Sequence, residues 1–306
     1  MSDIIFGPIN SRRFGRSLGI DLSPALKQCN FDCVYCELKG AKTVDQMRDI
    51  VSVRKVIDAL KLALEKHKNI DVITITANGE PTLYPYLDEL VDEINKIKQN
   101  HKLLILSNGA NIVKKDVEDA LRKIDIVKLS LDCATKKCFK KIDRPYNSID
   151  LDTIIKAMKS FSKSYKGSLV IEVLVVKGIN DKDDEFERLN TILNEIKPDR
   201  VDISTIDRPP AYRVHRVSMS RLKELSGFLE NLHVSIAYRK DYKGEKESFS
   251  EDEILYLISR RPQSEADIEL GFDDDSKIRF EKLLEKENIY QVEIAGAKFF
   301  KIGERK

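Results

Sequence analysis

A regular alternation of short β-rich runs with longer amphipathic stretches constrains the fold of this chain most. Seven runs are rich in apolar and β-branched residues, as expected of strands that are covered on both faces. They are residues 17–22, 72–76, 103–107, 126–131, 169–176, 201–205 and 234–238. Between them apolar residues recur at helical spacing; Ile57, Leu60 and Leu64, for example, follow Ser52, a suitable N-cap. This alternation predicts βαβ units around a parallel sheet.

The number of strands and a change of pattern near residue 240 predict two parts. Seven strands fall short of the eight strand–helix units of a closed barrel. We therefore predict an α/β fold, a partial (β/α)6–7 TIM-like barrel over residues 1–240, and a polar linker over 241–249. Residues 250–306 contain three helical stretches and a hairpin that turns at Ala295–Gly296. That order predicts a small winged-helix-like module.

Composition narrows the class of protein. Charged residues make up 34% of the 306 residues, but the net charge is only +2, so there is no general basic signal for nucleic acid. The chain begins without a signal-peptide pattern, and no apolar run approaches the roughly 20 residues that span a bilayer. The five cysteines are an odd number, unlike a disulfide scaffold. We expect a cytoplasmic protein with reduced thiols and no membrane partner.

Three cysteines are crowded into the loop after the first predicted strand. Cys29, Cys33 and Cys36 form C-x3-C-x2-C within "CNFDCVYCE", and loops after strands carry the chemistry in α/β folds. Three thiolates suit a soft metal centre. Structural zinc usually takes four ligands, whereas three thiolates on a 4Fe–4S cluster leave one iron open. Buried free thiols are the alternative, which the polar neighbours Asn30 and Asp32 disfavour.

The cysteine spacing, with the aromatic Tyr35 before the last cysteine, resembles the radical S-adenosylmethionine (SAM) superfamily. Further motifs follow in the family's order at the ends of predicted strands: "ANGEP" (77–81), "SNG" (107–109), "SLD" (130–132) and "VKGIND" (176–181). "ANGEP" resembles the family's Gly-Gly-Glu-Pro motif, with Asn78 in place of the first glycine. Together with residues 6–24, these motifs resemble a subgroup related to the tRNA wyosine-base synthetases. Those enzymes carry a second cluster on upstream cysteines, but no cysteine precedes Cys29 here.

This resemblance implies cofactors and a reaction. Cys29, Cys33 and Cys36 would bind three irons of a 4Fe–4S cluster, and the fourth iron would chelate SAM. An electron from a flavodoxin- or ferredoxin-type donor would cleave SAM reductively, and the resulting 5′-deoxyadenosyl radical would abstract hydrogen from a substrate. The chain would then be a radical SAM enzyme, an oxidoreductase or lyase.

The resemblance also implies residues that contact SAM. Tyr35 would pack near the adenine, and Gly79, which has no Cβ, would let backbone approach the methionyl part. Glu80 would accept a hydrogen bond from the methionyl ammonium, and Pro81 would stiffen the turn. The other candidates at this mouth are Ser107, Asn108, Ser130, Asp132 and Glu172. Each also has an ordinary structural interpretation as turn or strand polarity. Cys133 and Cys138, after the fourth strand, are expected to be free thiols.

Arginines indicate the kind of substrate. The candidates are Arg12, Arg13, Arg144, Arg208 and Arg213. Arginine matches phosphate and carboxylate in a bidentate manner, so an anionic substrate is expected, with modification of tRNA or another RNA favoured. Ordinary surface arginines are the alternative for each. Two other functions stay open, namely a radical SAM enzyme that modifies or activates a peptide or protein, and a non-enzymatic iron–sulfur regulator with a winged-helix tail.

The charge of the C-terminal residues argues against DNA as a partner. Residues 246–306 contain 11 basic and 15 acidic residues, a net charge of −4. The third predicted helix begins with Asp273, Asp274 and Asp275, which suit the helix dipole but repel a phosphate backbone. We therefore expect no sequence-specific DNA binding, and instead a protein contact, a dimer interface or a lid over the barrel.

Overall fold

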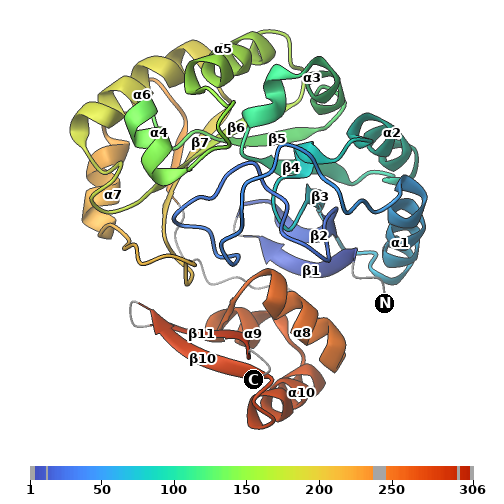
Figure 1. The fold of residues 1–306 in the computed structure, drawn as a ribbon. Coiled ribbons are helices and arrows are strands. Elements are labelled where there is room, and N and C mark those ends of the chain that lie inside the picture. The colour runs from blue at the N-terminus through green and yellow to red at the C-terminus, as the bar shows by residue number, and fades with distance from the viewer. Residues whose placement is uncertain (1–3, 12, 237–245, 295–296, 304–306) are drawn as a thin grey trace.

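One curved eight-stranded sheet forms the larger part of the molecule (Figure 1). The computed structural model describes residues 4–11, 13–236, 246–294 and 297–303. The strands lie in chain order: β1 (Ile5–Ser11), β2 (Gly15–Asp21), β3 (Val72–Thr76), β4 (Lys102–Ser107), β5 (Ile126–Ser130), β6 (Ser168–Val175), β7 (Arg200–Thr205) and β8 (Val234–Ile236). From β2 to β8 every neighbour pairs in parallel. The predicted partial barrel is confirmed.

Strand β1 was not predicted. It pairs antiparallel with β2, in a register that places Ile5 opposite Ile20. Gly7 and Pro8 interrupt its apolar pattern, which is why the sequence did not identify it. Proline is tolerated there because β1 is an edge strand of the sheet, where a missing N–H breaks no ladder.

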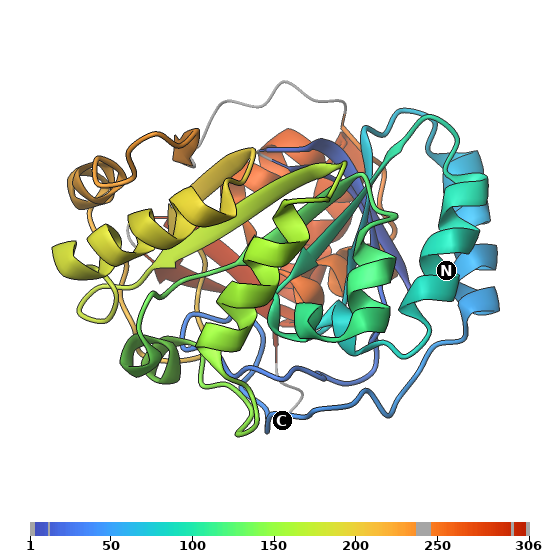
Figure 2. The same ribbon diagram turned by 90° about the horizontal axis from the view of Figure 1, so that it is seen from above.

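Helices cover the outer face of the sheet (Figure 2). They are α1 (Val53–Lys66), α2 (Leu87–Ile97), α3 (Lys115–Leu121), α4 (Lys136–Ile142), α5 (Leu151–Ser162), α6 (Asp183–Ile196) and α7 (Met219–Ser226), with 3-10 turns η1 (Pro81–Leu83) and η2 (Ala110–Val113). In α1 the predicted stripe is confirmed: Ile57, Leu60 and Leu64 are buried, and the Ser52 side chain accepts from the Lys55 N–H. Among the described residues, none of the helices is long and apolar enough to span a membrane.

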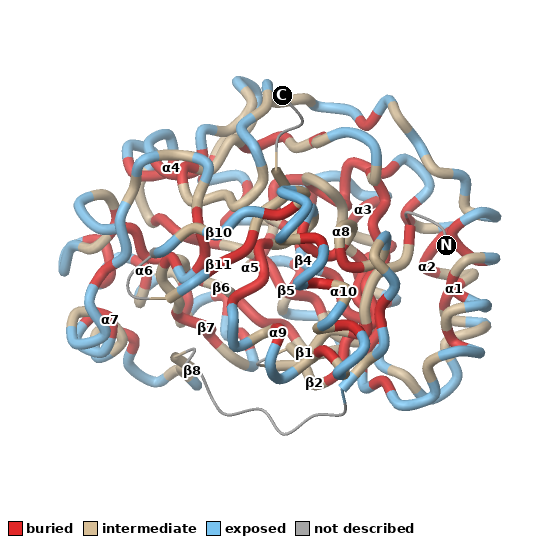
Figure 3. The backbone as a smooth tube through the Cα atoms, turned by 90° about the horizontal axis from the view of Figure 1, so that it is seen from below, coloured by how far each residue is buried: buried red, intermediate tan, exposed pale blue. Residues whose placement is uncertain are grey.

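The core runs along the parallel strands (Figure 3). Leu18, Ile73, Ile105 and Ile171, one from each of four strands, are all completely buried. A parallel sheet with helices outside it is buried on both faces, as the nearly continuous apolar runs predicted. The carboxyl ends of the strands therefore project their loops toward one mouth, where the predicted motifs lie.

The C-terminal module, residues 246–303 as described, has its own sheet and apolar cluster. It contains α8 (Glu251–Arg260), β9 (Gln263–Ser264), α9 (Glu265–Gly271), α10 (Asp274–Glu285), β10 (Ile289–Ile294) and β11 (Ala297–Ile302). The sheet order is β10-β11-β9, and its cluster includes Phe249, Phe272 and Phe280. The predicted turn at Ala295–Gly296 lies outside the described residues. The winged-helix-like assignment and the domain limits stay predictions.

The C-terminal module packs beside β1 and β2 (Figure 1). Helix α8 contacts β1, and the rings of Phe6 and Tyr256 meet edge to face with centroids 6.5 Å apart. Buried ion pairs join the same surfaces, including Arg16 with Glu247 and Arg260 with Asp21. The module is thus attached along the first parallel strand, whose end leads into the cysteine loop.

Candidate functional site

The three clustered cysteines lie, half-buried, in the long loop between β2 and α1. The Phe31 N–H donates to Cys29 Sγ over 3.4 Å, and Lys27 Nζ to Cys36 Sγ over 3.4 Å. Burial raises the pKa of Cys29 to about 12 and also raises the pKa of Cys33 and Cys36. The thiols are therefore neutral until a metal ion supplies the positive charge that favours thiolate.

The "ANGEP" loop is hydrogen-bonded to the cysteine loop. The Gln28 N–H donates to Asn78 O, and the Glu80 N–H donates to Gln28 O, both over 2.9 Å. Gly79, with a φ of +134°, lies so close that an added Cβ would sit 1.8 Å from Gln28 O. We expected this glycine to admit the methionyl part of SAM. The close approach that the structure shows is instead to the backbone beside Cys29.

Glu80 is buried at the start of η1, and several donors hold its carboxylate. Oε1 accepts from the Thr82 N–H (3.0 Å), Thr82 Oγ1 (2.6 Å) and Ser107 Oγ (2.7 Å). Oε2 accepts from the Asn108 N–H over 2.8 Å, its one donor among the described residues. Burial raises the pKa of Glu80, although these hydrogen bonds oppose the shift. Ser107 and Asn108 are thus brought to Glu80, and Pro81 is the first residue of η1.

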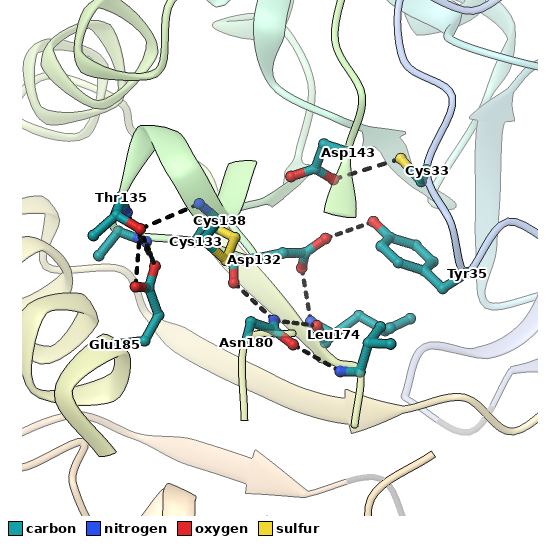
Figure 4. The surroundings of a disulfide bond; sticks show 12 residues. Cys33, Tyr35, Asp132, Cys133, Thr135, Cys138, Asp143, Leu174, Asn180 and Glu185 are labelled. Carbon is teal, nitrogen blue, oxygen red and sulfur yellow. Dashed lines mark hydrogen bonds between the residues drawn. A yellow bond between two sulfur atoms is a disulfide. The ribbon is translucent and has the colours of Figure 1, made fainter. Parts of the chain in front are cut away.

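Tyr35 is held by Asp132, at the end of the fifth strand (Figure 4). The phenol donates to Asp132 Oδ2 over 2.5 Å, and the Leu174 N–H donates to Oδ1 over 2.7 Å. Asp132 also shares a hydrogen bond with buried Asp143, which accepts from Cys33 Sγ over 3.5 Å. Burial raises the pKa of Asp132 to about 7 and that of Asp143 well above its usual range. Two carboxyls so close share a proton.

Asp143 is a site residue that the sequence reasoning missed. It follows α4 outside any motif, and only the fold brings it to Cys33 and Asp132. Ser130, the last residue of β5, lines a cavity of about 10 Å³ together with Asn108, Asp132 and Asp143. That volume holds about one water molecule, so this polar corner is closely packed.

Glu172 and Arg13 are paired with each other inside the barrel. Arg13 Nη1 lies 2.7 Å and Lys128 Nζ 3.0 Å from Glu172 Oε1, and both cations lie 3.3 Å from Asp202 Oδ2. Burial alone would raise the pKa of Glu172, but Lys128 and Arg13 outweigh it and lower the pKa to about 2. We expected Glu172 at the ribose and Arg13 at the substrate. The structure places both in one largely buried network of compensating charges, and their expected roles stay predictions.

The other candidate arginines divide into buried and exposed groups. Arg208 is buried, and its Nη2 lies 2.9 Å from Asp267 Oδ2 in the C-terminal module. It therefore joins two parts of the chain, and its expected role at the substrate stays a prediction. Arg144 and Arg213 are exposed, while Arg12 lies outside the described residues. The Arg144 guanidinium stacks 4.4 Å from the Tyr212 ring, whose hydroxyl donates to Asp32.

Cys133 and Cys138, expected as free thiols, form a disulfide (Figure 4). The chain turns from β5 into α4 here, and this turn brings their Cα atoms to 5.7 Å, within the range that a disulfide spans. Glu185 accepts from the N–H groups of Ala134 and Thr135 and thereby holds the same turn. The expectation of reduced thiols was wrong at these two positions.

The arrangement fits an iron–sulfur cluster with SAM beside it. Three soft sulfur donors lie on one loop. The backbone N–H of Glu80, whose carboxylate is buried, donates to Gln28 O of that loop. Among the described residues, the three sulfur atoms do not all lie within 4.8 Å of one another. Their spread is therefore wide for one ion, whereas a cluster offers each thiolate its own iron.

The family model of the radical SAM superfamily matches residues 24–189, more than half of the chain. The protein therefore belongs to the radical SAM superfamily, and it is an enzyme with the cofactors of that superfamily, a 4Fe–4S cluster and SAM. Its expected membership is confirmed. The wyosine-related subgroup stays a prediction.

Relatives extend over the whole chain. A UPF0026 protein of Helicobacter pylori strain J99 is 43% identical over 299 residues, which cover 97% of both chains. A UPF0026 protein of Methanocaldococcus jannaschii is 28% identical over 312 residues, covering 97% of this chain and 95% of that one. Streptococcus suis SuiB bound to S-adenosylmethionine matches with a TM-score of 0.56 at 20% identity, over 72% of this chain and 50% of that chain, and shows the same fold.

Proposed function

We propose that this radical SAM enzyme abstracts hydrogen from an anionic substrate, with a nucleotide or an RNA base as the favoured target. One observation carries the choice of an anion: Arg144 is exposed and pairs only with Asp32 at the surface of the cysteine loop, whereas the side chains of Arg13 and Arg208 are largely buried in ion pairs. A GTP 3',8-cyclase of Helicobacter pylori strain J99 is 28% identical over 159 residues, covering 51% of this chain and 46% of that one. Its name indicates a nucleotide substrate, which supports the same class here.

Cys29, Cys33 and Cys36 would hold the cluster. When bound, the cluster and SAM supply a one-electron reductive cleavage and the 5′-deoxyadenosyl radical that takes the hydrogen atom. The protein supplies position and shielding. Glu80 would bind the SAM ammonium through Oε2, while its Oε1 is oriented by Thr82 and Ser107. Because several donors hydrogen-bond to this carboxylate, its rotation is restricted, and its remaining lone pairs keep one fixed direction.

Tyr35 and Ser130 would complete the SAM site. The hydrogen bond from Tyr35 to Asp132 fixes the aromatic ring of Tyr35 next to Cys36, where the ring would pack against the adenine. Ser130 ends β5 at the same level as that pair and would donate to the methionyl carboxylate or the ribose. Gly79 would act indirectly, by allowing the cysteine loop to pack against the "ANGEP" loop.

Arg144 would bind the substrate. Its guanidinium lies over the Tyr212 ring, and its Nη1 is 3.4 Å from Oδ2 of Asp32, the residue before Cys33. An exposed ion pair is worth only about 0–1 kcal/mol, so an incoming phosphate or carboxylate can take the arginine at little cost. A peptide substrate is the alternative, and an acidic peptide would use the same arginine.

The experiment measures 5′-deoxyadenosine. The protein is reconstituted anaerobically with iron and sulfide, reduced, and supplied with SAM and either bulk RNA, nucleotides or peptides. We expect a substrate-dependent increase with RNA or nucleotides, and a higher half-saturating concentration for Arg144→Gln with an unchanged basal rate. Cys33→Ala should abolish both the cluster and the cleavage. An increase only with peptides would replace the proposed substrate class, and cleavage by Cys33→Ala would remove these cysteines from the mechanism.

A further inference from the structure

The C-terminal module contacts the cysteine loop on the side that precedes Cys29. Arg260, the last residue of α8, places its Nε 3.2 Å from Asp21 Oδ2 and donates through Nη2 to Pro24 O. Asp21 is the last residue of β2, and Pro24 lies in the loop that leads to the first cysteine. One arginine of the module thus touches both the end of the strand and the start of the loop.

Asp21 connects this contact to the SAM motif. Its carboxyl is buried, and Oδ1 accepts from the Ser23 N–H over 2.9 Å and from the Asn78 N–H over 2.8 Å. The same side chain therefore fixes the beginning of the cysteine loop and the "ANGEP" loop. A buried carboxylate needs a compensating charge, and Arg260 supplies it from outside the barrel.

A second contact lies on the side that follows Cys36. Buried Arg208 donates to Pro262 O and to Asp267 Oδ2 of the module, and its Nε lies 3.7 Å from Glu37 Oε2. Glu37 is the residue after Cys36. The module thus contributes Arg260 to one flank, and on the other flank it anchors Arg208, which follows β7 in the barrel and lies beside Glu37.

The loop needs such support because it has little structure of its own. Residues 22–52 contain no helix or strand, only isolated bridges at Gln28 and Phe31. Ordering a segment of that length costs about 1–2 kcal/mol per residue in backbone entropy. A cluster nevertheless requires its three ligands within roughly 0.5 Å of their places.

We infer that the C-terminal module is a clamp that holds the cysteine loop in the geometry of cluster binding, and that Arg260 is its main positioning residue. The clamp consists of Arg260 with Asp21 and Pro24 before the cysteines, and of Arg208 with Glu37 after them. This role needs no substrate contact and no nucleic acid.

The test uses the full-length apo-protein, so it does not depend on the proposed reaction. Arg260→Gln is compared with the wild type by the rate at which iodoacetamide alkylates Cys29, Cys33 and Cys36, read by peptide mass spectrometry. We expect about tenfold faster alkylation, which corresponds to ~1.4 kcal/mol of lost local stability. Arg260→Lys, which keeps the charge, should recover part of the protection.

Lys66→Gln is the matched control, because Lys66 of α1 pairs over 3.3 Å with Glu253, which lies on α8 like Arg260. Lys66 itself is not in the cysteine loop. We expect its alkylation rates to equal those of the wild type. After reconstitution, Arg260→Gln should also lose iron to a chelator several-fold faster than Lys66→Gln. Unchanged alkylation in folded Arg260→Gln, or equal acceleration in Lys66→Gln, would overturn the clamp. If Arg260→Gln does not fold, Arg260→Ala produced at lower temperature and Arg260→Lys are measured in its place. Wild-type rates of cysteine alkylation in both variants would overturn the clamp as well.

Discussion

At the scale of single residues, the carboxylate of Glu80 is the group on which most donors converge. In Glu80→Gln an amide NH₂ group replaces one carboxylate oxygen. That oxygen is either Oε1, which accepts from Thr82 and Ser107, or Oε2, which accepts from Asn108. We expect about 1–3 kcal/mol of lost stability, because a buried donor then faces another donor. Binding of SAM to the reconstituted protein should weaken at least about tenfold, since a charge-assisted bond is lost.

The measurements are urea unfolding and equilibrium dialysis of SAM. Glu89→Gln on exposed α2 surface is the control, and it should change neither quantity. SAM affinity equal to that of the wild type in a folded Glu80→Gln variant would remove Glu80 from the SAM site and leave it a structural role only.

Gly79 offers a test of the contact between two loops. Gly79→Ala must place a Cβ against Gln28 O at a φ of +134°, so the cysteine loop has to move. Gly178→Ala is strained by its φ of +76° alone, because nothing described lies within 4 Å of the added Cβ. We expect about 1–2 kcal/mol of destabilisation for Gly178→Ala, a clearly larger loss for Gly79→Ala, and reduced iron content for Gly79→Ala only. Iron analysis and urea unfolding check this, and equal effects would contradict it.

Glu172 predicts a pH dependence of stability. Its pKa is lowered to about 2 in the folded protein, against about 4.3 in the unfolded chain. A carboxyl whose pKa is lower in the folded than in the unfolded state stabilises the folded protein at pH values above the unfolded pKa. This stabilisation is lost as the pH falls from about 5 toward 2. Glu172→Gln should therefore be less stable than the wild type by about 3 kcal/mol at pH 7, with a difference that shrinks as the pH falls through 4.

Urea unfolding at pH 7, 5, 4 and 3 measures that difference. Glu187→Gln, on the exposed side of α6, is the control and should show no pH-dependent difference from the wild type. A deficit of Glu172→Gln that stays constant between pH 7 and pH 3 would mean that packing, rather than the charges of Lys128 and Arg13, sets its contribution.

At the scale of elements, the turn from β5 to α4 is crosslinked by Cys133 and Cys138. Denatured, non-reduced apo-protein should therefore present three alkylatable thiols, those of Cys29, Cys33 and Cys36. Reduction should destabilise the protein by about 2 kcal/mol on the chain-entropy estimate for so short a loop. Mass spectrometry after alkylation counts the thiols, and a count of five without reduction would contradict the crosslink.

The elements that the sequence predicted share one property, which is a pattern confined to neighbouring residues. Parallel strands such as β3 and β6 are nearly continuous apolar runs, and α1 has a regular apolar stripe. Their secondary structure can therefore be predicted from neighbouring residues alone. Strand β1 contains Gly7 and Pro8, and β9 has only two residues, so neither offers a periodic signal. Both become strands because a partner strand lies beside them.

The same distinction separates the site residues. The cysteines and Glu80 belong to short motifs at the ends of strands, and the sequence placed them at one mouth. The Arg13–Glu172 pair joins residues 159 positions apart, and Asp143 reaches Cys33 across 110 positions. Such partners depend on the curvature of the partial barrel, which no local pattern encodes. The ion-pair partners of charged residues are therefore what the sequence could not predict.

At the scale of the whole molecule, buried charges attach the C-terminal module to the barrel. Arg16 in β2 pairs with Glu247, which His67 of the barrel also approaches at 3.6 Å. Removing one partner of a buried pair leaves the other uncompensated and costs up to about 3–5 kcal/mol. Arg16→Gln should therefore speed amide hydrogen exchange in the described residues of α8 to β11, while the central strands β3 to β6 exchange as in the wild type, because local openings are separate events.

Hydrogen exchange with mass spectrometry measures both regions in one sample. Arg54→Gln is the control, since the Arg54–Asp58 pair is almost fully exposed and worth about 0–1 kcal/mol. Exchange that rises equally in the module and in the central strands would show that the chain unfolds as one cooperative unit, and it would contradict separate attachment. Exchange that rises only in the module would mean that one buried pair at the base of β2 governs the docking of the part that supports the cysteine loop.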